Sequence, residues 1–146
     1  MPGINFYTED IKFTLKNKTA LRRWITAATE KEGFKIEQLN YIFSSDKFLH
    51  NLNEHYLHHD EFTDIITFDL STPNPGLKAR GLFADIFISI ERVKENAKIF
   101  RTTFQNELHR VIIHGALHLC GYLDKTKKDK AKMREKEDYF LSLRSF

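Results

Sequence analysis

The sequence contains little cysteine, proline or glycine: one, three and six residues of 146. The lone Cys120 cannot form an intramolecular disulfide, which excludes a secreted disulfide scaffold. No apolar run approaches the ~20 residues that a membrane-spanning helix needs. Glu9 and Asp10 lie where a signal peptide would require an uninterrupted apolar stretch. These absences predict a soluble protein with a cytoplasmic location and no membrane association.

The composition predicts one compact core. Hydrophobic residues make up 41% of the chain and aromatic residues 13%, and thirteen residues are phenylalanine. The 23 basic and 20 acidic side chains nearly balance, giving a net charge of +3 with histidine neutral. This hydrophobic content is too high, and this net charge too low, for a disordered chain. We therefore expect residues 1–146 to form a single domain.

One segment concentrates positive charge. Between residues 125 and 136, seven basic side chains are interrupted only by Asp129 and Glu135; they are Lys125, Lys127, Lys128, Lys130, Lys132, Arg134 and Lys136. Such a run is typical of the solvated face of a helix. It is also typical of phosphate contacts near a nucleic-acid site, and the sequence leaves both interpretations open.

Periodicity predicts an α+β fold in which a mixed sheet of about four strands combines with about five helices. Strand patterns cover 34–43, 64–70 and 82–90. Residues 4–15 are expected to form two short strands or one interrupted strand around a Thr-Glu-Asp turn at 8–10. Helical patterns cover 19–33, 46–56, 89–100, 105–120 and the stretch from 126. We expect the strands at 64–70 and 82–90 to pair as an antiparallel hairpin or as near neighbours. The helix from 46 should bury Phe48, Leu49, Leu52 and Tyr56, and the spacing of the helix from 89 continues through Val93, Ala97 and Phe100.

Two histidines concentrate the chemistry. His114 and His118 are four residues apart in a helical run and lie ~40° apart on one face, so both imidazoles can reach one ion. Gly121 can turn the chain back after the helix and bring Asp124 toward them. Two imidazoles and a carboxylate leave a fourth position open, which is typical of a catalytic zinc site. A bound water of lowered pKa could then attack an ester or amide.

The competing interpretation is that both histidines are hydrogen-bonded residues of a core helix. That helix is apolar all round, so unpartnered imidazoles would be costly there and a metal site is favoured. In HExxH peptidases a glutamate directly follows the first histidine, whereas Gly115 stands here, which disfavours a zincin-type peptidase. Cys120 lies ~200° around the helix from His118 and is interpreted as a small buried hydrophobe.

Three blocks resemble one known family. HGALHLCGYLD, at 114–124, is similar to the HGxLHLxGYDH signature of the YbeY-type rRNA maturation factors. LNEHYLHHDEFTDIITFDL, at 52–70, resembles the family's LNxxYRxxDxPTDVLSFP stretch, and GLFADIFIS, at 81–89, resembles its GDIxIS strand. The order and spacing of the blocks fit, and the resemblance covers roughly residues 40–140.

The resemblance implies an α+β fold with helices around a four-stranded sheet and a zinc ion at one end of a cleft. It implies a metal-dependent endoribonuclease specific for single strands, which matures ribosomal RNA, including the 3′ end of the small-subunit RNA, and acts in ribosome quality control. The expected partners are single-stranded or ribosomal precursor RNA and the ribosome or its proteins. By position, His114 and His118 match the first two ligands, and the third falls on Asp124.

Two departures from the family pattern affect the site. Asp124 replaces a histidine ligand, which extends the candidate metals from zinc to manganese, nickel and iron. Leu57 replaces an arginine suited to stabilising charge on a phosphate, and His58 or His59 could substitute for it when protonated. The general base stays unassigned.

Three functions follow from these residues. The first is a metal-dependent hydrolase that cuts single-stranded RNA, with basic residues holding the backbone. The second is a ribosome-associated RNA-binding factor whose metal is mainly structural, which the loss of the arginine favours. The third is a metal-dependent hydrolase of another substrate, because site and substrate are not tightly linked.

Overall fold

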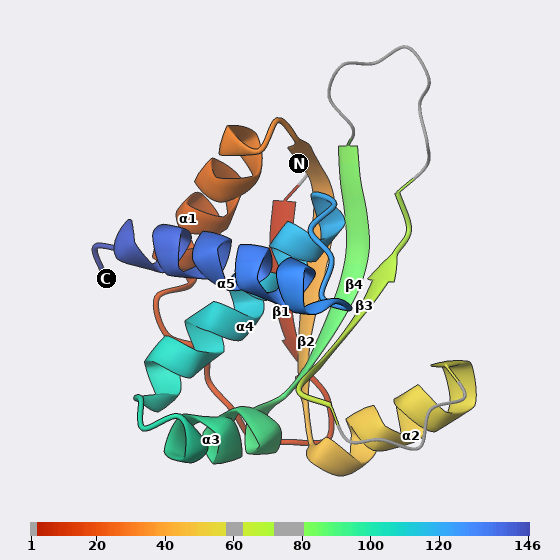
Figure 1. Cartoon of the computed structure of the whole chain (residues 1–146). Coiled ribbons are helices and arrows are strands. Elements are labelled where there is room, and N and C mark those ends of the chain that lie inside the picture. The colour runs from red at the N-terminus through yellow and green to blue at the C-terminus, as the bar shows by residue number, and fades with distance from the viewer. Residues whose placement is uncertain (1–2, 58–62, 72–80) are drawn as a thin grey trace.

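A computed structural model describes residues 3–57, 63–71 and 81–146 (Figure 1). The described residues form four strands and five helices, which confirms the predicted α+β class. In chain order they are β1 (Gly3–Thr8), α1 (Lys18–Lys31), β2 (Lys35–Ser44), α2 (Asp46–Leu57), β3 (Ile65–Asp69), β4 (Gly81–Ser89), α3 (Ile90–Ile99), α4 (Phe104–Leu119) and α5 (Lys127–Ser142). No helix in the described segments is both long and apolar enough to cross a membrane.

The strands form one mixed sheet in the order β1-β2-β4-β3. β1, β2 and β4 run parallel, and β3 is antiparallel to β4, as expected for the two pairing strands. Within the predicted range of 4–15 the described structure has one strand, which stops at Thr8, where the Thr-Glu-Asp turn was expected to interrupt it. It ends because the chain turns at Asp10, whose carboxylate accepts hydrogen bonds from the Ser45 backbone N–H (3.0 Å) and hydroxyl (2.6 Å).

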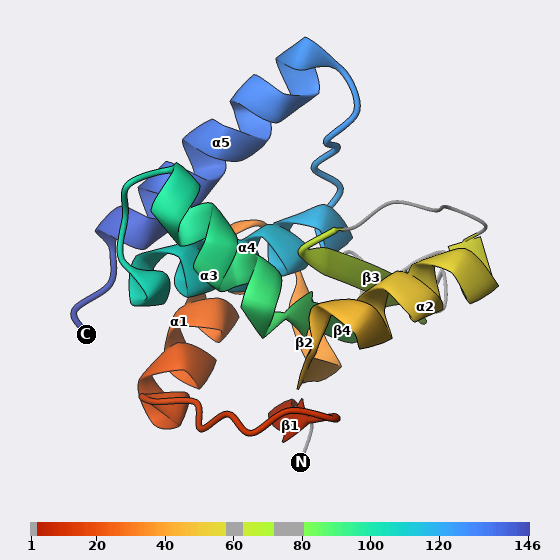
Figure 2. The ribbon, with the colours of Figure 1, turned by 90° about the horizontal axis from the view of Figure 1, so that it is seen from below.

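The two faces of the sheet are covered unequally. On one face β4 presents fully buried side chains to α1 and α4; these are Leu82, Ala84, Ile86 and Ile88. On the other face α2 lies alone, opposite α4 (Figure 2), with Phe48 stacked on Phe87 at a centroid distance of 6.2 Å. The hydrophobic core therefore lies between the sheet and the helices that carry the two histidines and the basic run.

The predicted buried stripe of α2 is only partly correct. Leu49 is fully buried, but Tyr56 is 66% exposed, and Asn53 is buried instead. The last turn of α2 extends past the edge of the sheet (Figure 1), where the Tyr56 ring meets Phe68 edge-on at 6.3 Å. The periodicity correctly predicted the helix but could not show where its packing partner ends.

Two contacts fix α4 over the sheet. The buried Tyr41 hydroxyl donates a hydrogen bond to the Ile112 carbonyl at 3.0 Å. At Gly115 the helix approaches the strands so closely that an added Cβ would lie 3.0 Å from Cδ1 of Ile65 and 3.2 Å from Cγ2 of Ile86. The position of the histidine-bearing helix is thus set directly by the sheet.

A buried histidine, His109, connects α4 to the C-terminus. His109 is buried between Trp24 and Phe146, and its Nδ1 accepts a 2.7 Å hydrogen bond from Arg144. The Arg144 guanidinium also donates to Asn106 at 2.7 Å. Burial, reinforced by the Arg144 charge, lowers the pKa of His109 to about 4.

This lowered pKa predicts acid sensitivity. Above pH ~6.5, His109 is neutral in both the folded and the unfolded chain and contributes no pH dependence. As the pH falls, the unfolded chain binds a proton that the folded chain does not, so stability decreases until the folded pKa is reached. From pH 8 to pH 4.5 the loss should be roughly 2.5 kcal/mol. Denaturant unfolding of His109→Gln should show a correspondingly smaller pH dependence, while the exposed His55→Gln should match wild type.

Candidate functional site

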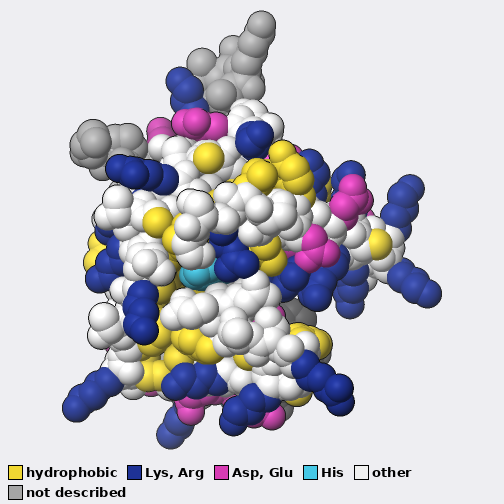
Figure 3. Space-filling model, turned by 90° about the vertical axis from the view of Figure 1, so that its left-hand side faces the viewer, with side chains coloured by type: hydrophobic (Ala, Val, Ile, Leu, Met, Phe, Trp, Pro, Cys, Tyr) yellow, Lys and Arg dark blue, Asp and Glu magenta, His cyan; other side chains and the backbone are white. Residues whose placement is uncertain are grey.

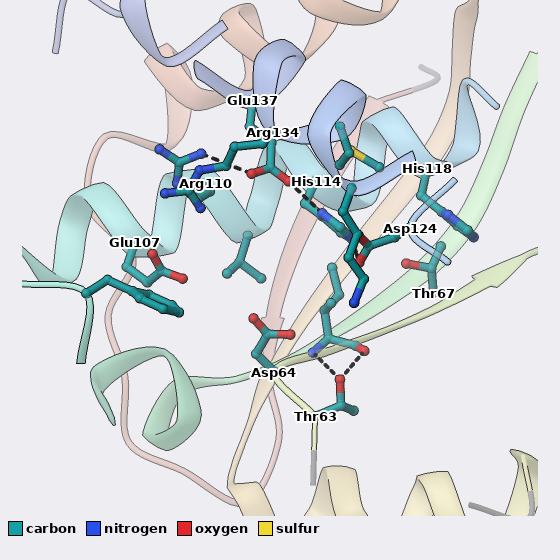
Figure 4. A pocket seen from close by; sticks show the side chains of 15 residues that line it. Thr63, Asp64, Thr67, Glu107, Arg110, His114, His118, Asp124, Arg134 and Glu137 are labelled. Atoms are coloured by element: carbon teal, nitrogen blue, oxygen red, sulfur yellow. Dashed lines mark hydrogen bonds and ion pairs between the residues drawn. The ribbon is translucent and has the colours of Figure 1, made fainter. Parts of the chain in front are cut away.

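A cleft of about 530 Å³ lies between α4, α5 and the segment that enters β3 (Figure 4). Its lining is predominantly charged or polar, and the three residues that the sequence singled out, His114, His118 and Asp124, all belong to it. The other charged lining residues are Asp64, Glu107, Arg110, Lys130, Arg134 and Glu137. A cleft lined by both acidic and basic side chains suits a charged substrate that binds together with a cation.

His114 is held between two carboxylates. Its Nδ1 lies 2.7 Å from Oε2 of Glu137, and its Nε2 lies 3.8 Å from Oδ2 of Asp124. In the neutral ring, a proton on Nδ1 that bonds to Glu137 leaves the Nε2 lone pair toward Asp124 and the cleft. Burial opposes the charged imidazole, but the hydrogen bond to Glu137 and the charges of Glu137 and Asp124 outweigh it, so the pKa of His114 is raised.

Glu137 is itself held in place. Its side chain is 6% exposed, and its Oε1 accepts a 3.0 Å hydrogen bond from Arg110. Arg110 also donates to Asp138 at 2.7 Å, so the guanidinium joins α4 to two successive residues of α5. The carboxylate behind His114 is therefore charge-paired and fixed in orientation. Metal-ligating histidines almost always donate their second ring N–H to such a group.

The chain reversal after α4 brings Asp124 to His114, as the sequence predicted. Gly121 adopts the left-handed conformation with φ 102°. The Tyr122 hydroxyl then donates to Glu32 at 2.6 Å, and Lys136 donates to the same carboxylate at 3.1 Å. These bonds connect the reversed segment to α1 and α5 and so hold Asp124 at the mouth of the cleft.

His118 lines the same cleft, but its exposed imidazole points away from His114 and Asp124 (Figure 4). Within residues 3–57, 63–71 and 81–146, no three His, Cys, Asp or Glu side chains are gathered closely enough to hold a metal ion. The structure thus brings together two of the three predicted ligands. Cys120 is partly buried, and burial raises the pKa of its thiol to about 12, which suits the predicted apolar role.

The donor set nevertheless fits a divalent ion. Two ligands with bonds of ~2.0–2.2 Å at tetrahedral angles lie roughly 3.3–3.5 Å apart, close to the 3.8 Å between His114 and Asp124. The Nε2 atom of His114 carries a free lone pair in the tautomer that Glu137 selects. His118 lies one helical turn from His114 on α4 and lines the same cleft.

Two further carboxyls in the cleft were not identified from the sequence. Asp64 precedes β3, and Glu107 lies in the first turn of α4, buried to 4% exposure. Burial raises the pKa of both, and the charge of Asp64 raises that of Glu107 further, against the opposing charges of Arg110 and Arg134. Asp64 lies in the 52–70 block that resembles the family pattern, but the sequence assigned no role to it or to Glu107. Only the tertiary fold places both carboxyls in the cleft with His114.

The basic run at residues 125–136 includes both side chains suited to phosphate contacts and side chains on the solvated face of α5. Lys130 and Arg134, one turn apart on α5, line the cleft. Lys136 instead bonds to Glu32, and Lys132 is exposed at the surface. In the part of the chain that the structure describes, neither Lys130 nor Arg134 forms an ion pair, so both are available to a phosphate. By contrast, Lys and Arg side chains on the face over α1 and α3 project singly, with hydrophobic side chains between them (Figure 3).

Of Leu57, His58 and His59, the structure describes Leu57. Leu57 ends α2 and does not line the cleft. His58 and His59, which could take over a phosphate contact, lie outside the described residues.

Comparison with known proteins identifies relatives over nearly the whole chain. The family model for endoribonuclease YbeY matches residues 3–144. The endoribonuclease YbeY of Cytophaga hutchinsonii is 49% identical over 143 residues, covering 98% of this chain and 96% of the relative. That of Christiangramia forsetii is 45% identical over 140 residues, covering 96% and 93%.

A solved structure agrees with these relatives. The solution structure of TM1509 from Thermotoga maritima is similar with a TM-score of 0.62 and 28% identity, covering 95% of this chain and 87% of that one. The likeness of fold and the sequence matches over nearly the whole chain agree with the resemblance of the three sequence blocks. The chain belongs to the endoribonuclease YbeY family.

Proposed function

We propose that this protein is a metal-dependent endoribonuclease that cleaves single-stranded RNA in the cleft between α4 and α5. The observation that carries the proposal is the arrangement of His114, with the buried Glu137 behind its Nδ1 and Asp124 facing its Nε2. Family membership supplies the reaction class, since the relatives are named endoribonucleases.

His114, His118 and Asp124 would hold one divalent ion. Zinc is the first candidate, and a carboxylate in place of the family's third histidine extends the set to manganese, nickel and iron. When bound, such an ion supplies Lewis-acid polarisation of a phosphoryl oxygen and a lowered pKa for bound water. The remaining steps fall to the residues around it.

The chain's own side chains provide substrate binding and proton handling. Lys130 and Arg134 are suited to bind the phosphates on either side of the scissile bond. Asp64 and Glu107 are suited to exchange a proton with the reacting oxygens, since burial raises their pKa values toward the working pH. Arg110 donates to Oε1 of Glu137 and so holds that side chain where its Oε2 can accept the Nδ1 proton of His114.

The resemblance to the maturation factors supports three finer proposals. The substrate is ribosomal precursor RNA, including the 3′ end of the small-subunit RNA, and the activity serves ribosome quality control in the cytoplasm. The ribosome or its proteins act as partners. We also propose that residues 1–146 form one domain, since α1, α4 and α5 share a core with the sheet.

The first test is cleavage of a single-stranded RNA by wild type and by His118→Ala, purified identically. Each is assayed with zinc, manganese and nickel and in a chelated control. We expect cleavage that requires both the histidine and a metal. Equal cleavage by the two proteins would reveal a contaminating nuclease and would reject the proposal.

A ribosome-associated RNA-binding factor is the second candidate. Leu57, in place of the family's arginine, favours it because it removes a group suited to stabilise phosphate charge. Tight RNA binding without cleavage under any of the three metals would support this function. Cleavage of peptides or small phosphoesters, and not of RNA, would support a hydrolase of another substrate.

Because part of the basic run lines the cleft, we expect those side chains to determine how strongly RNA affinity depends on salt. Replacing Lys130 and Arg134 by glutamine should weaken RNA binding and reduce the slope of log affinity against log salt by about 1.4, from ~0.7 for each single-strand phosphate contact. The matched control is Lys128→Gln with Lys132→Gln, which has the same spacing on α5 outside the cleft. Fluorescence anisotropy at several salt concentrations measures both. If the Lys130 and Arg134 double variant kept the wild-type slope, the whole run would be assigned to the solvated surface.

A further inference from the structure

One aromatic side chain in the cleft has no role in the site described so far. Phe100 lines the cleft, and its side chain is 56% exposed. Its position continues the stripe of Val93 and Ala97 on α3, yet those two residues are buried and Phe100 is not. The cleft therefore combines an open aromatic surface with the cations Lys130 and Arg134.

The backbone holds Phe100 rigidly. At the end of α3 the Thr102 N–H donates to the Ala97 carbonyl (2.9 Å) and the Arg101 N–H to the Lys98 carbonyl (3.2 Å). Arg101 takes the left-handed conformation, φ 54°, where glycine is usual. This is a Schellman motif with an arginine at its left-handed position.

The chain beyond this motif is equally fixed. Thr103 caps α4 by accepting a 3.0 Å hydrogen bond from the Asn106 N–H, and the Asn106 side chain donates to Thr102 at 2.9 Å. Phe100 thus projects from a corner with defined geometry between two helices. A preorganised aromatic ring loses little conformational entropy when a flat partner binds.

We propose that Phe100 is a stacking platform for one unpaired base of the RNA strand in the cleft, an inference that rests on the proposed function. Proteins that bind single strands combine cationic grooves for the backbone with aromatic rings for the bases. Lys130 and Arg134 supply the first element here, and Phe100 supplies the second. A base within a duplex is already stacked on both faces, so this contact favours single-stranded substrates.

The test measures binding of a fluorescein-labelled, unstructured oligoribonucleotide and of a hairpin duplex to the full-length protein in chelator, which prevents cleavage. Phe100→Ala should weaken single-strand binding about 5- to 150-fold and leave duplex binding unchanged. Phe100→Tyr should restore single-strand binding to within about threefold, because it keeps the ring. Ile99→Ala is the matched control, since Ile99 is 61% exposed on the same turn but does not line the cleft.

A second series identifies the contact directly. Each oligonucleotide in this series carries a single abasic nucleotide, at a different position along the strand. At one position the missing base should weaken binding to wild type but should not further weaken binding to Phe100→Ala. The inference would be overturned if, at every position, the loss of affinity from the abasic nucleotide simply added to the loss from Phe100→Ala. It would also be overturned if Phe100→Ala bound single-stranded RNA as tightly as Ile99→Ala. If wild type binds and cleaves RNA in either case, the proposed function stands without Phe100. If wild type binds no RNA, the proposed function itself fails.

Discussion

Glu137→Gln is expected to lower metal affinity about 10- to 100-fold, the usual effect of removing a partner that orients a histidine ligand. Glutamine keeps the shape of the side chain but loses the charge that pairs with Arg110. Its amide can also donate to Nδ1 of His114, which would move the ring proton to Nε2 and block the lone pair that faces Asp124. RNA cleavage at limiting metal should fall with the affinity.

Glu135→Gln is the matched control, because it makes the same chemical change one half-turn away on a side chain that is 71% exposed. Competition with a chelating dye measures metal affinity, and nitrogen NMR of the imidazoles reports the tautomer of His114 without metal. Unfolding curves exclude a loss of folded protein. If Glu137→Gln binds metal like Glu135→Gln, then Glu137 has no part in the site.

Asp124→Ala is expected to have the larger effect, since it removes a proposed ligand itself. The loss in metal affinity should exceed the ~10- to 100-fold expected for a supporting residue. Asp124→His should restore binding and shift the preference from manganese toward zinc, because imidazole is the softer ligand. Asp124→Ala shows whether the third ligand is needed for binding, and Asp124→His shows whether its chemical type sets the metal preference.

Leu123→Ala provides the control for Asp124, since it alters the exposed neighbouring side chain in the same reversed segment. Metal content after dialysis against zinc and manganese, alone and in equal mixture, measures both affinity and preference. If Asp124→Ala retained the wild-type affinity, Asp124 would be removed from the proposed ligands and the pair formed with His114 would be an ordinary polar contact.

The features that the sequence predicted correctly depend on short-range geometry. Helical spacing correctly placed His114 and His118 on one helix, α4, and the approach of Asp124 to His114 follows from the left-handed turn at Gly121. The helix predicted from residue 126 also starts there, with Thr126 as its cap and Asp129 completing a capping box. In each case the deciding residues lie within about ten positions of one another.

The features that escaped prediction depend on contacts across the fold. Glu137 is 23 residues from His114 and stands at the end of a basic run that masks it. Asp64 and Glu107 meet only because β3 passes beneath α4. Tyr56 was expected in the core because periodicity shows which face of a helix is apolar, but not how far the neighbouring sheet extends.

The close approach at Gly115 limits which enzymes this scaffold could evolve into. A glutamate at that position, as in HExxH peptidases, would need space that Ile65 and Ile86 already fill. Acquiring it would require lifting the histidine helix off the sheet and breaking the bond between Tyr41 and Ile112. New catalytic acids and bases should therefore arise in the segment that enters β3 or on α5, where descendants of this protein are free to vary. The helix that carries the histidines, α4, should stay unchanged.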